Sequence, residues 1–125
     1  MRFMMLVKHA EELSGPPPQA LIDAIDKLTE EANKAGTMVA AGGLAPAAAS
    51  THVRVTRGNV KTTDGPFSEA KEVIGGFAIF DLKSKQEAIE GAQRFMDLHR
   101  IHWPAWEGET EIRQIFAPED CPPRR

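Results

Sequence analysis

The chain has 125 residues, of which 42% are hydrophobic and 26% are charged, and its formal net charge at pH 7 is -3. This length suits one domain around one hydrophobic core, and the slightly acidic balance offers no basic surface for a phosphate backbone, so nucleic acid is not expected as a partner. The one cysteine, Cys121, cannot form an internal disulfide, and no run approaches the roughly 20 apolar residues of a membrane span. We therefore expect a cytoplasmic protein that does not enter a membrane.

The first predicted element is a strand over Arg2–Lys8 with apolar side chains on both faces. Phe3, Met5 and Val7 form one face, and Met4 and Leu6 form the other. A strand of this kind needs helices on one side and a second cover on the other, which a single two-layer domain does not supply.

A first helix follows, because Leu21, Ile25, Leu28 and Ala32 recur at helical spacing, and Gly36 marks its end. The next predicted strand covers Thr37–Ala41.

A hairpin is predicted next. One strand covers His52–Thr56, the tip is Arg57–Asn59, and the chain returns over Val60–Thr63.

The remaining elements are a strand, a helix and a last strand. Phe77–Leu82 is apolar on both faces, and Ser84 with Glu87 three residues later forms a capping box for a second helix. We expect this helix to end near His99, since Pro104 disfavours helical geometry in the residue before it. The last strand covers Glu109–Phe116, so the predicted domain spans residues 1–117 and residues 118–125 form a flexible tail.

This order predicts an α+β fold, a ferredoxin-like βαββαβ domain with an inserted hairpin and an antiparallel sheet that carries two helices on one face. The other face keeps the apolar side chains of the first strand and of Phe77–Leu82. We therefore expect a homodimer that packs sheet face against sheet face.

The segment Asp64–Phe77 reads DGPFSEAKEVIGGF, and together with the opening Met1–Lys8 and the closing Glu111–Arg113 it resembles the DGPF-domain proteins of the YCII-related family. The resemblance implies a dimeric α+β barrel. It implies no single activity, because such barrels include lactone isomerases, dehalogenating lyases, small monooxygenases and haem-degrading enzymes. In YCII-type relatives a histidine on the first helix meets an acidic residue in a cleft. This chain has no histidine between Leu21 and Gly36, so that pair is not carried over.

Three residues are candidates for acid–base catalysis. Asp64 heads the signature turn and either accepts hydrogen bonds from the backbone of its own turn or faces a cleft as a general base or substrate anchor. His99 and His102 share a helix face if the helix continues that far, which suits a common ligand or a proton relay. The alternative is that histidines near a helix C-terminus are favoured by the helix dipole alone.

Candidates for ligand binding are mainly aromatic: His9, Phe67, Trp103, Trp106 and Arg113. A metal held by His99, His102 and His9 is conceivable. However, no HxH, HExxH or paired-cysteine spacing occurs, so no metal or other cofactor is predicted.

Two hypotheses of function remain open. The first is a cofactor-independent isomerase, lyase or dehalogenase-like enzyme that uses Asp64 with His99 or His102 in a cleft between the sheet and the hairpin. The second is a non-catalytic dimer that binds a small ligand or has a regulatory role. Convergent histidine and aspartate side chains would favour the enzyme, whereas a cavity lined by tryptophan and phenylalanine would favour the binder.

Overall fold

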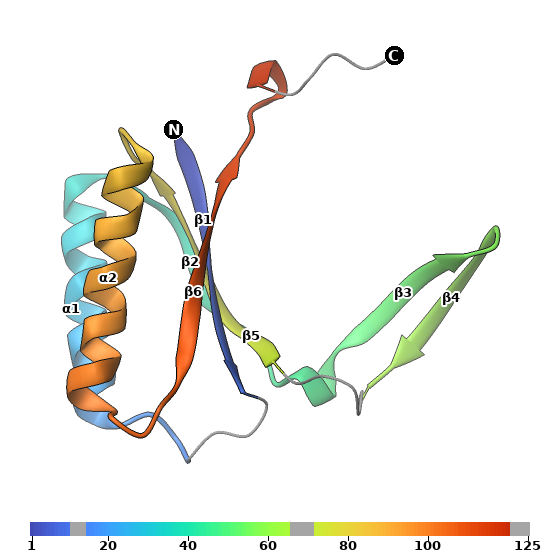
Figure 1. The fold of residues 1–125 in the computed structure, drawn as a ribbon, viewed down its shortest axis with the longest axis horizontal. Helices are drawn as coiled ribbons and strands as arrows, with labels where there is room; N and C mark the ends of the chain where they lie inside the picture. Colours follow the sequence, from blue (N-terminus) through green and yellow to red (C-terminus); the bar gives the residue numbers. More distant parts are fainter. Residues whose placement is uncertain (11–14, 66–71, 121–125) are drawn as a thin grey trace.

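The computed structural model describes residues 1–10, 15–65 and 72–120. The elements of the main body follow in chain order (Figure 1): β1 (Arg2–Ala10), α1 (Gln19–Ala35), β2 (Met38–Gly43), β5 (Glu72–Asp81), α2 (Lys85–His102) and β6 (Gly108–Ile115). Between β2 and β5 the chain forms a short 3-10 turn, Ala47–Ala49, and the strands β3 (Thr51–Thr56) and β4 (Asn59–Asp64). A second 3-10 turn covers Pro118–Asp120.

The main sheet has four antiparallel strands in the order β2-β5-β1-β6, and both helices cover one of its faces (Figure 1). The central pair joins the two strands with apolar side chains on both faces, so that Phe3 lies opposite Phe80 and Met5 opposite Ala78. This arrangement confirms the predicted α+β, ferredoxin-like fold.

The helix ends show how local sequence sets the elements. Gly36 ends α1 with φ of +73°, a conformation that glycine adopts without steric cost. At the start of α2 the backbone N–H of Glu87 donates to the Ser84 hydroxyl over 3.2 Å, as the capping box predicts.

Two predicted boundaries differ from the structure by three residues or more, and the other strand boundaries differ by at most two. The helix α2 continues to His102 rather than ending near His99, because the proline restricts only the residue before it: Trp103 leaves the helix with φ of -143° while its N–H still bonds the His99 carbonyl. The strand β5 begins at Glu72 rather than Phe77, because Val73 and Ile74 keep pairing with β1 beyond a bulge between Val7 and Lys8.

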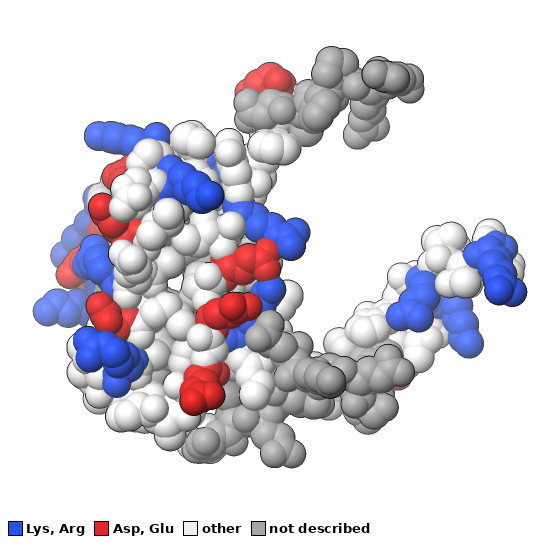
Figure 2. All heavy atoms as spheres, in the orientation of Figure 1, with Lys and Arg blue, Asp and Glu red and all other residues white. Residues whose placement is uncertain are grey.

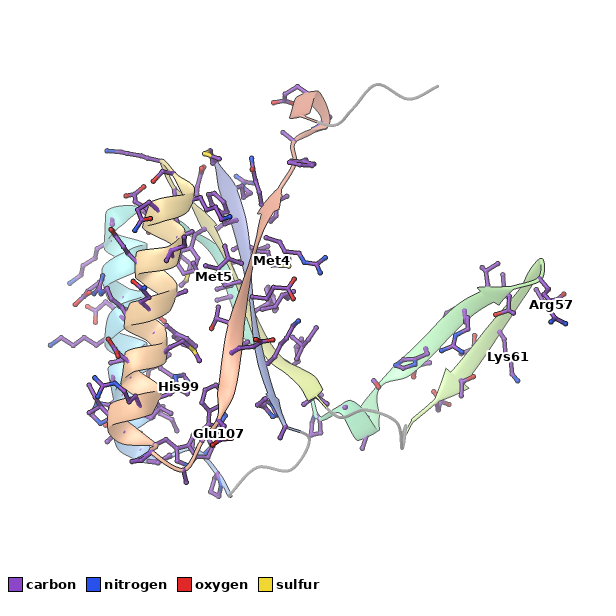
Figure 3. All side chains as sticks on the ribbon, viewed as in Figure 1. Met4, Met5, Arg57, Lys61, His99 and Glu107 are labelled. Carbon is purple, nitrogen blue, oxygen red and sulfur yellow. The ribbon has the colours of Figure 1, made fainter. Side chains whose placement is uncertain are left out.

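The hydrophobic core lies between α2 and the sheet. Phe3, Met5, Ala88 and Ala92 are no more than 6% exposed, and the partly buried Phe80, Leu82 and Ile112 pack around them. Figure 3 shows Met5 pointing toward the helices and its neighbour Met4 pointing to the other side of the sheet. The face that carries Met4 is called the open face below.

The predicted hairpin is confirmed as β3 and β4, which pair only with each other among the described strands. Arg57 and Gly58 form its tip with φ of 52° and 79°, the two positive values of a two-residue type I′ turn. Figure 1 shows this hairpin extending away from the body on the open-face side of the sheet. We refer to Thr51–Asp64 as the arm.

Some sequence predictions fall outside the described residues: Phe67, Cys121, the last five residues and positions 66–71 of the signature. In the part of the chain that the structure describes, neither helix is long and apolar enough to cross a bilayer.

Candidate functional site

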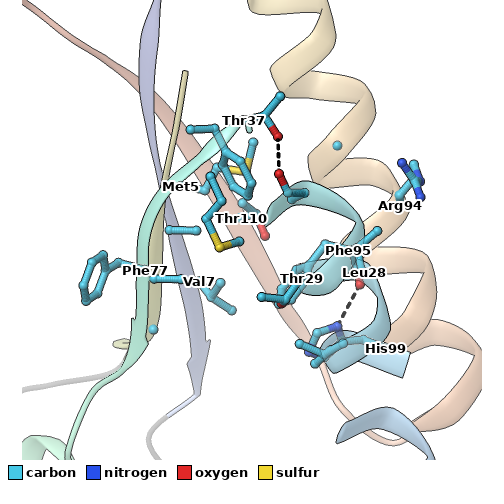
Figure 4. Close-up of a pocket in the computed structure, with 18 of the residues that line it drawn as sticks. Met5, Val7, Leu28, Thr29, Thr37, Phe77, Arg94, Phe95, His99 and Thr110 are labelled. Carbon is cyan, nitrogen blue, oxygen red and sulfur yellow. Dashed lines mark hydrogen bonds between the residues drawn. The ribbon is translucent and has the colours of Figure 1, made fainter. Parts of the chain in front are cut away.

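A cavity of about 830 Å³ lies between the sheet and the two helices, where residues of α1 and of α2 both face the β2–β5 half of the sheet (Figure 4). Its roof comes from α1 residues such as Ile25, Leu28 and Ala32, and the second helix contributes Phe95 and His99. Met5 and Val7 reach it from β1. We call this space the α1 cavity.

Much of the floor of the α1 cavity consists of very small residues from two neighbouring strands, with Met38 and Phe80 at one end. The small residues are Ala41, Gly42 and Gly43 of β2 and Gly75, Gly76 and Ala78 of β5. In register, Ala41 pairs with Ala78 and Gly43 pairs with Gly76. A helix above such a floor has little side-chain volume to pack against, which explains why space remains in a layer that is otherwise filled.

His99 is the buried polar group of this site, at 7% exposure. Its Nδ1 lies 3.0 Å from the Phe95 carbonyl oxygen, and since a carbonyl can only accept, this nitrogen carries the ring proton. The other nitrogen, Nε2, is therefore a hydrogen-bond acceptor in the uncharged ring. Burial lowers the pKa of His99 below its usual range, an effect that the bond to Phe95 opposes only in part. The imidazole is thus neutral at pH 7.

Aromatic rings surround that imidazole. The centroid of His99 lies 4.8 Å from that of Phe95 and 4.4 Å from that of Trp106, and the indoles of Trp103 and Trp106 are 6.4 Å apart. Gly108 makes room for this cluster, because a Cβ at that position would collide with the Trp106 ring and with the Lys8 carbonyl. The end of the cavity is therefore largely aromatic, and the His99 imidazole lies among these rings.

His9 approaches the same cavity from the end of β1. Its ring lies directly over Gly75, so close that a Cβ there would be 2.6 Å from Nε2. The Nδ1 of His9 is 2.6 Å from the Ala10 carbonyl oxygen and carries its proton, as in His99. The first glycine of the Gly75–Gly76 pair thus has a specific role, which is to provide space for an imidazole.

An ion pair connects the two helices beside the cavity. The Arg94 guanidinium donates to the Glu31 carboxylate over 2.9 Å, and both side chains are more than half exposed. Both residues also line the cavity. Charged groups therefore lie at its solvent side, while its interior is apolar.

The structure brings together four of the predicted site residues, since His9, His99, Trp103 and Trp106 all line the α1 cavity. His102 lies on the same helix but does not line it.

Asp64 and Arg113 lie elsewhere in the chain. Asp64 is exposed at the base of the arm, where its carboxylate accepts the Thr51 hydroxyl over 2.6 Å. Arg113 donates to Glu111, which also accepts from Lys8, and these two bonds lower the pKa of Glu111, Lys8 contributing most. Within one chain, then, Asp64 does not meet His99, and the cavity lies between helix and sheet rather than between sheet and hairpin.

Sequence reasoning did not find the floor of the cavity. Its signal was available as two segments rich in glycine and alanine, Ala40–Gly43 and Gly75–Ala78, in which Phe77 is the one large residue and which pair with each other in the sheet. For metals, no three His, Cys, Asp or Glu side chains within residues 1–10, 15–65 and 72–120 come close enough together to hold an ion.

Comparison with known proteins agrees with this fold. A model of the YCII-related domain matches residues 1–96, more than three quarters of the chain. The protein belongs to the YCII-related family. A relative from Rhizobium meliloti (strain 1021), named uncharacterized protein R00369, is 29% identical over 101 residues, which cover 81% of this chain and 77% of the relative. The family match ends before His99, Trp103 and Trp106, so the aromatic end of the cavity lies beyond the matched region.

Proposed function

We propose that this YCII-related protein binds a small, uncharged, largely apolar molecule in the α1 cavity. The observation that carries this proposal is the combination of a space of about 830 Å³ above a floor of glycine and alanine with one buried, neutral imidazole. That volume falls within the range of sites for small molecules, which are mostly apolar with a few fixed polar groups.

The chemistry of the lining defines the ligand class. A charged group at the aromatic end would lose its hydration without gaining an opposite charge, because His99 is neutral there. The Nε2 atom of His99 can accept one hydrogen bond, and Trp106 offers a flat indole surface beside it. A planar aromatic molecule with one N–H or O–H donor satisfies both features.

Isothermal titration calorimetry with indole and 1-methylindole tests this proposal, because a methyl group replaces the N–H proton in the second compound and removes the donor. We expect indole to bind more tightly by about fivefold, the ratio that one net hydrogen bond provides. His99→Leu should remove that difference. Equal affinities for the two compounds in the wild type would contradict the role of His99, and the absence of heat with both would contradict the site.

A pair of substitutions on α1 controls for indirect effects. Ala32→Leu places three more carbons in the roof of the cavity and should weaken indole binding at least tenfold. Ala24→Leu is the matched control, since Ala24 is also partly buried on α1 but does not line the cavity. If both variants bind indole like the wild type, the ligand occupies another place.

Acid–base catalysis is a second candidate, favoured by one specific observation. Because Nδ1 is occupied by the Phe95 carbonyl and the ring is uncharged, the Nε2 lone pair of His99 is available to remove a proton at pH 7. The test is proton exchange in D₂O at the carbon next to the carbonyl of 2-tetralone, followed by NMR. The wild type should accelerate exchange, and His99→Gln should reduce it to the rate in buffer. Equal rates with and without wild-type protein would exclude this function for that class of substrate.

We also propose that a second copy covers the open face, as the sequence predicts. Met4, Leu6, Phe77 and Ile79 lie on that face, and all four are only partly buried in the single chain. An apolar face of this size favours association with a protein partner. Sedimentation equilibrium of the wild type and of Leu6→Asp tests it: a dimer that the substitution dissociates supports this interface, and a wild type that is monomeric at 100 µM opposes it.

A further inference from the structure

The arm has an apolar face that no described residue of its own chain covers. Val53, Val55 and Val60 are 67%, 71% and 70% exposed, and they lie together because Val55 pairs with Val60 and Val53 is two residues away on the same strand face. All residues of β3 and β4 are exposed. An isolated two-stranded hairpin is only marginally stable in water, so an arm of this kind needs a surface to pack against.

The other face and the tip of the arm are basic. Arg54 pairs with Lys61 across the two strands, and Arg57 occupies the tip, whereas the one carboxylate of the arm is Asp64 at its base. Figures 2 and 3 show these cations along the arm, with Arg57 and Lys61 labelled in the stick view. Because interfaces are electrostatically complementary, a basic arm favours a partner surface that is acidic.

The body supplies such a surface at the start of β6. Glu107 and Glu109 are exposed there, and Glu109 lies on the last strand of the sheet, whose outer edge is unpaired among the described strands. The opposite edge of the sheet is β2, and the chain leaves β2 to form the arm. When two such sheets pack face to face about a two-fold axis parallel to the strands, the β2 edge of one copy comes near the β6 edge of the other.

We propose that the arm of each copy packs against a second copy of this chain. Its valine face packs on the partner's body, and the long side chains of Arg54 and Lys61 extend from the opposite face past the edges of the two strands to acidic residues at the start of the partner's β6. The contact is made twice in the dimer, since each copy has one arm and one acidic edge. This inference builds on the proposed dimer and adds a contact that sheet packing alone does not require.

The valine face is tested first, by sedimentation equilibrium of a chain with Val53→Ser, Val55→Ser and Val60→Ser. We expect dissociation of the dimer to rise at least a hundredfold, while circular dichroism of the helices stays unchanged. Ile101→Ser is the control, because Ile101 is 57% exposed on α2, and it should leave the dimer intact. A dimer that survives the triple substitution at wild-type affinity overturns the role of the arm but leaves the sheet-face dimer standing. A monomeric wild type overturns both.

Charge reversal then tests which surface the arm meets. One chain carries Arg54→Glu and Lys61→Glu, and another carries Glu107→Lys and Glu109→Lys. Each homodimer then opposes like charges, but a mixture restores both contacts, so the mixture should form heterodimers at 50 mM salt and lose this preference at 1 M salt. If native mass spectrometry shows mainly heterodimers, the proposal is supported. Random mixing of the two chains, or no heterodimer at all, contradicts the acidic edge as the surface that the arm contacts.

Discussion

The two helices cover the same face of one sheet, but the space beneath them is filled in different ways. Under α2, Phe3, Met5, Ala88 and Ala92 pack at 6% exposure or less. Toward α1 the paired strands β2 and β5 carry glycine and alanine, and the cavity remains there, bordered by Met5, Phe80 and the neighbouring side of α2. The difference arises from side-chain volume on the strands, since the backbone order of the two halves follows the same ferredoxin-like pattern. One half of the layer stabilises the fold, and the other half can accept a ligand.

The largest expected effect is a loss of stability when a large side chain is removed from the filled half, the part of the layer under α2 that contains Phe3. Phe3→Ala should lower the free energy of unfolding by about 3–5 kcal/mol, because a cavity replaces a ring that is 2% exposed. Leu28→Ala, in the roof of the hollow half, should cost less than about 2 kcal/mol since it enlarges a space that already exists. Urea denaturation measures both. Equal losses would mean that the two halves are packed alike.

A substitution in the floor should have an intermediate effect. Gly75→Ala forces the His9 ring away, because the new methyl group would lie 2.6 Å from Nε2, and we expect a loss of about 1 kcal/mol. Gly43→Ala is the matched control, since its nearest neighbour is the Gly75 carbonyl oxygen at 4.0 Å. The NMR chemical shifts of the His9 ring should change in the first variant only. Unchanged shifts in Gly75→Ala would show that His9 does not lie over the floor.

A smaller effect should appear in the pH dependence of stability. The folded state lowers the pKa of His99, so the unfolded chain, with a usual value of about 6.5, binds a proton more readily. The contribution of His99 is therefore complete above pH 7.5 and declines as the pH falls through 6.5 toward the lowered value. His99→Leu should show a shallower decline between pH 7.5 and 5.5 in urea denaturation. Parallel curves would indicate that His99 is solvated in the folded protein.

The smallest effect concerns the ion pair between the helices. Glu31→Gln should cost less than about 1 kcal/mol, because both partners are largely exposed. Glu30→Gln is the control, since Glu30 pairs with Lys34 on α1 alone. If the Arg94 bond holds α1 over the hollow half, Glu31→Gln should also change indole affinity, whereas Glu30→Gln should not. If Glu31→Gln and Glu30→Gln bind indole with the same affinity, the ion pair between Arg94 and Glu31 does not hold α1 over the cavity.

Local signals in the sequence predicted most of the fold. The capping box at Ser84, the stop at Gly36 and the turn at Arg57–Gly58 each depend on a few neighbouring residues, and all three are confirmed. The end of α2 was predicted too early because the effect of Pro104 was extended from Trp103 to the residues before it.

The candidate site was predictable in its members but not in its shape. His9, His99, Trp103 and Trp106 stand out by residue type, yet a cavity is a difference between the volumes of facing elements, which no single segment reveals. Asp64 was placed with His99 in the first hypothesis because the hairpin was expected to border a cleft. In the structure the arm extends away from the body, and Asp64 at its base accepts the Thr51 hydroxyl, so the aspartate lies apart from the imidazole.

The hollow beneath α1 can be tested most directly with a crystal of the wild-type protein under xenon pressure, because apolar pockets in proteins bind xenon. We predict a xenon peak between α1 and the paired Ala41 and Ala78, and no peak among the packed Phe3, Ala88 and Ala92. A crystal structure in which α1 lies directly on the small residues of β2 and β5, with no xenon between them, would contradict the cavity and the binding function built on it.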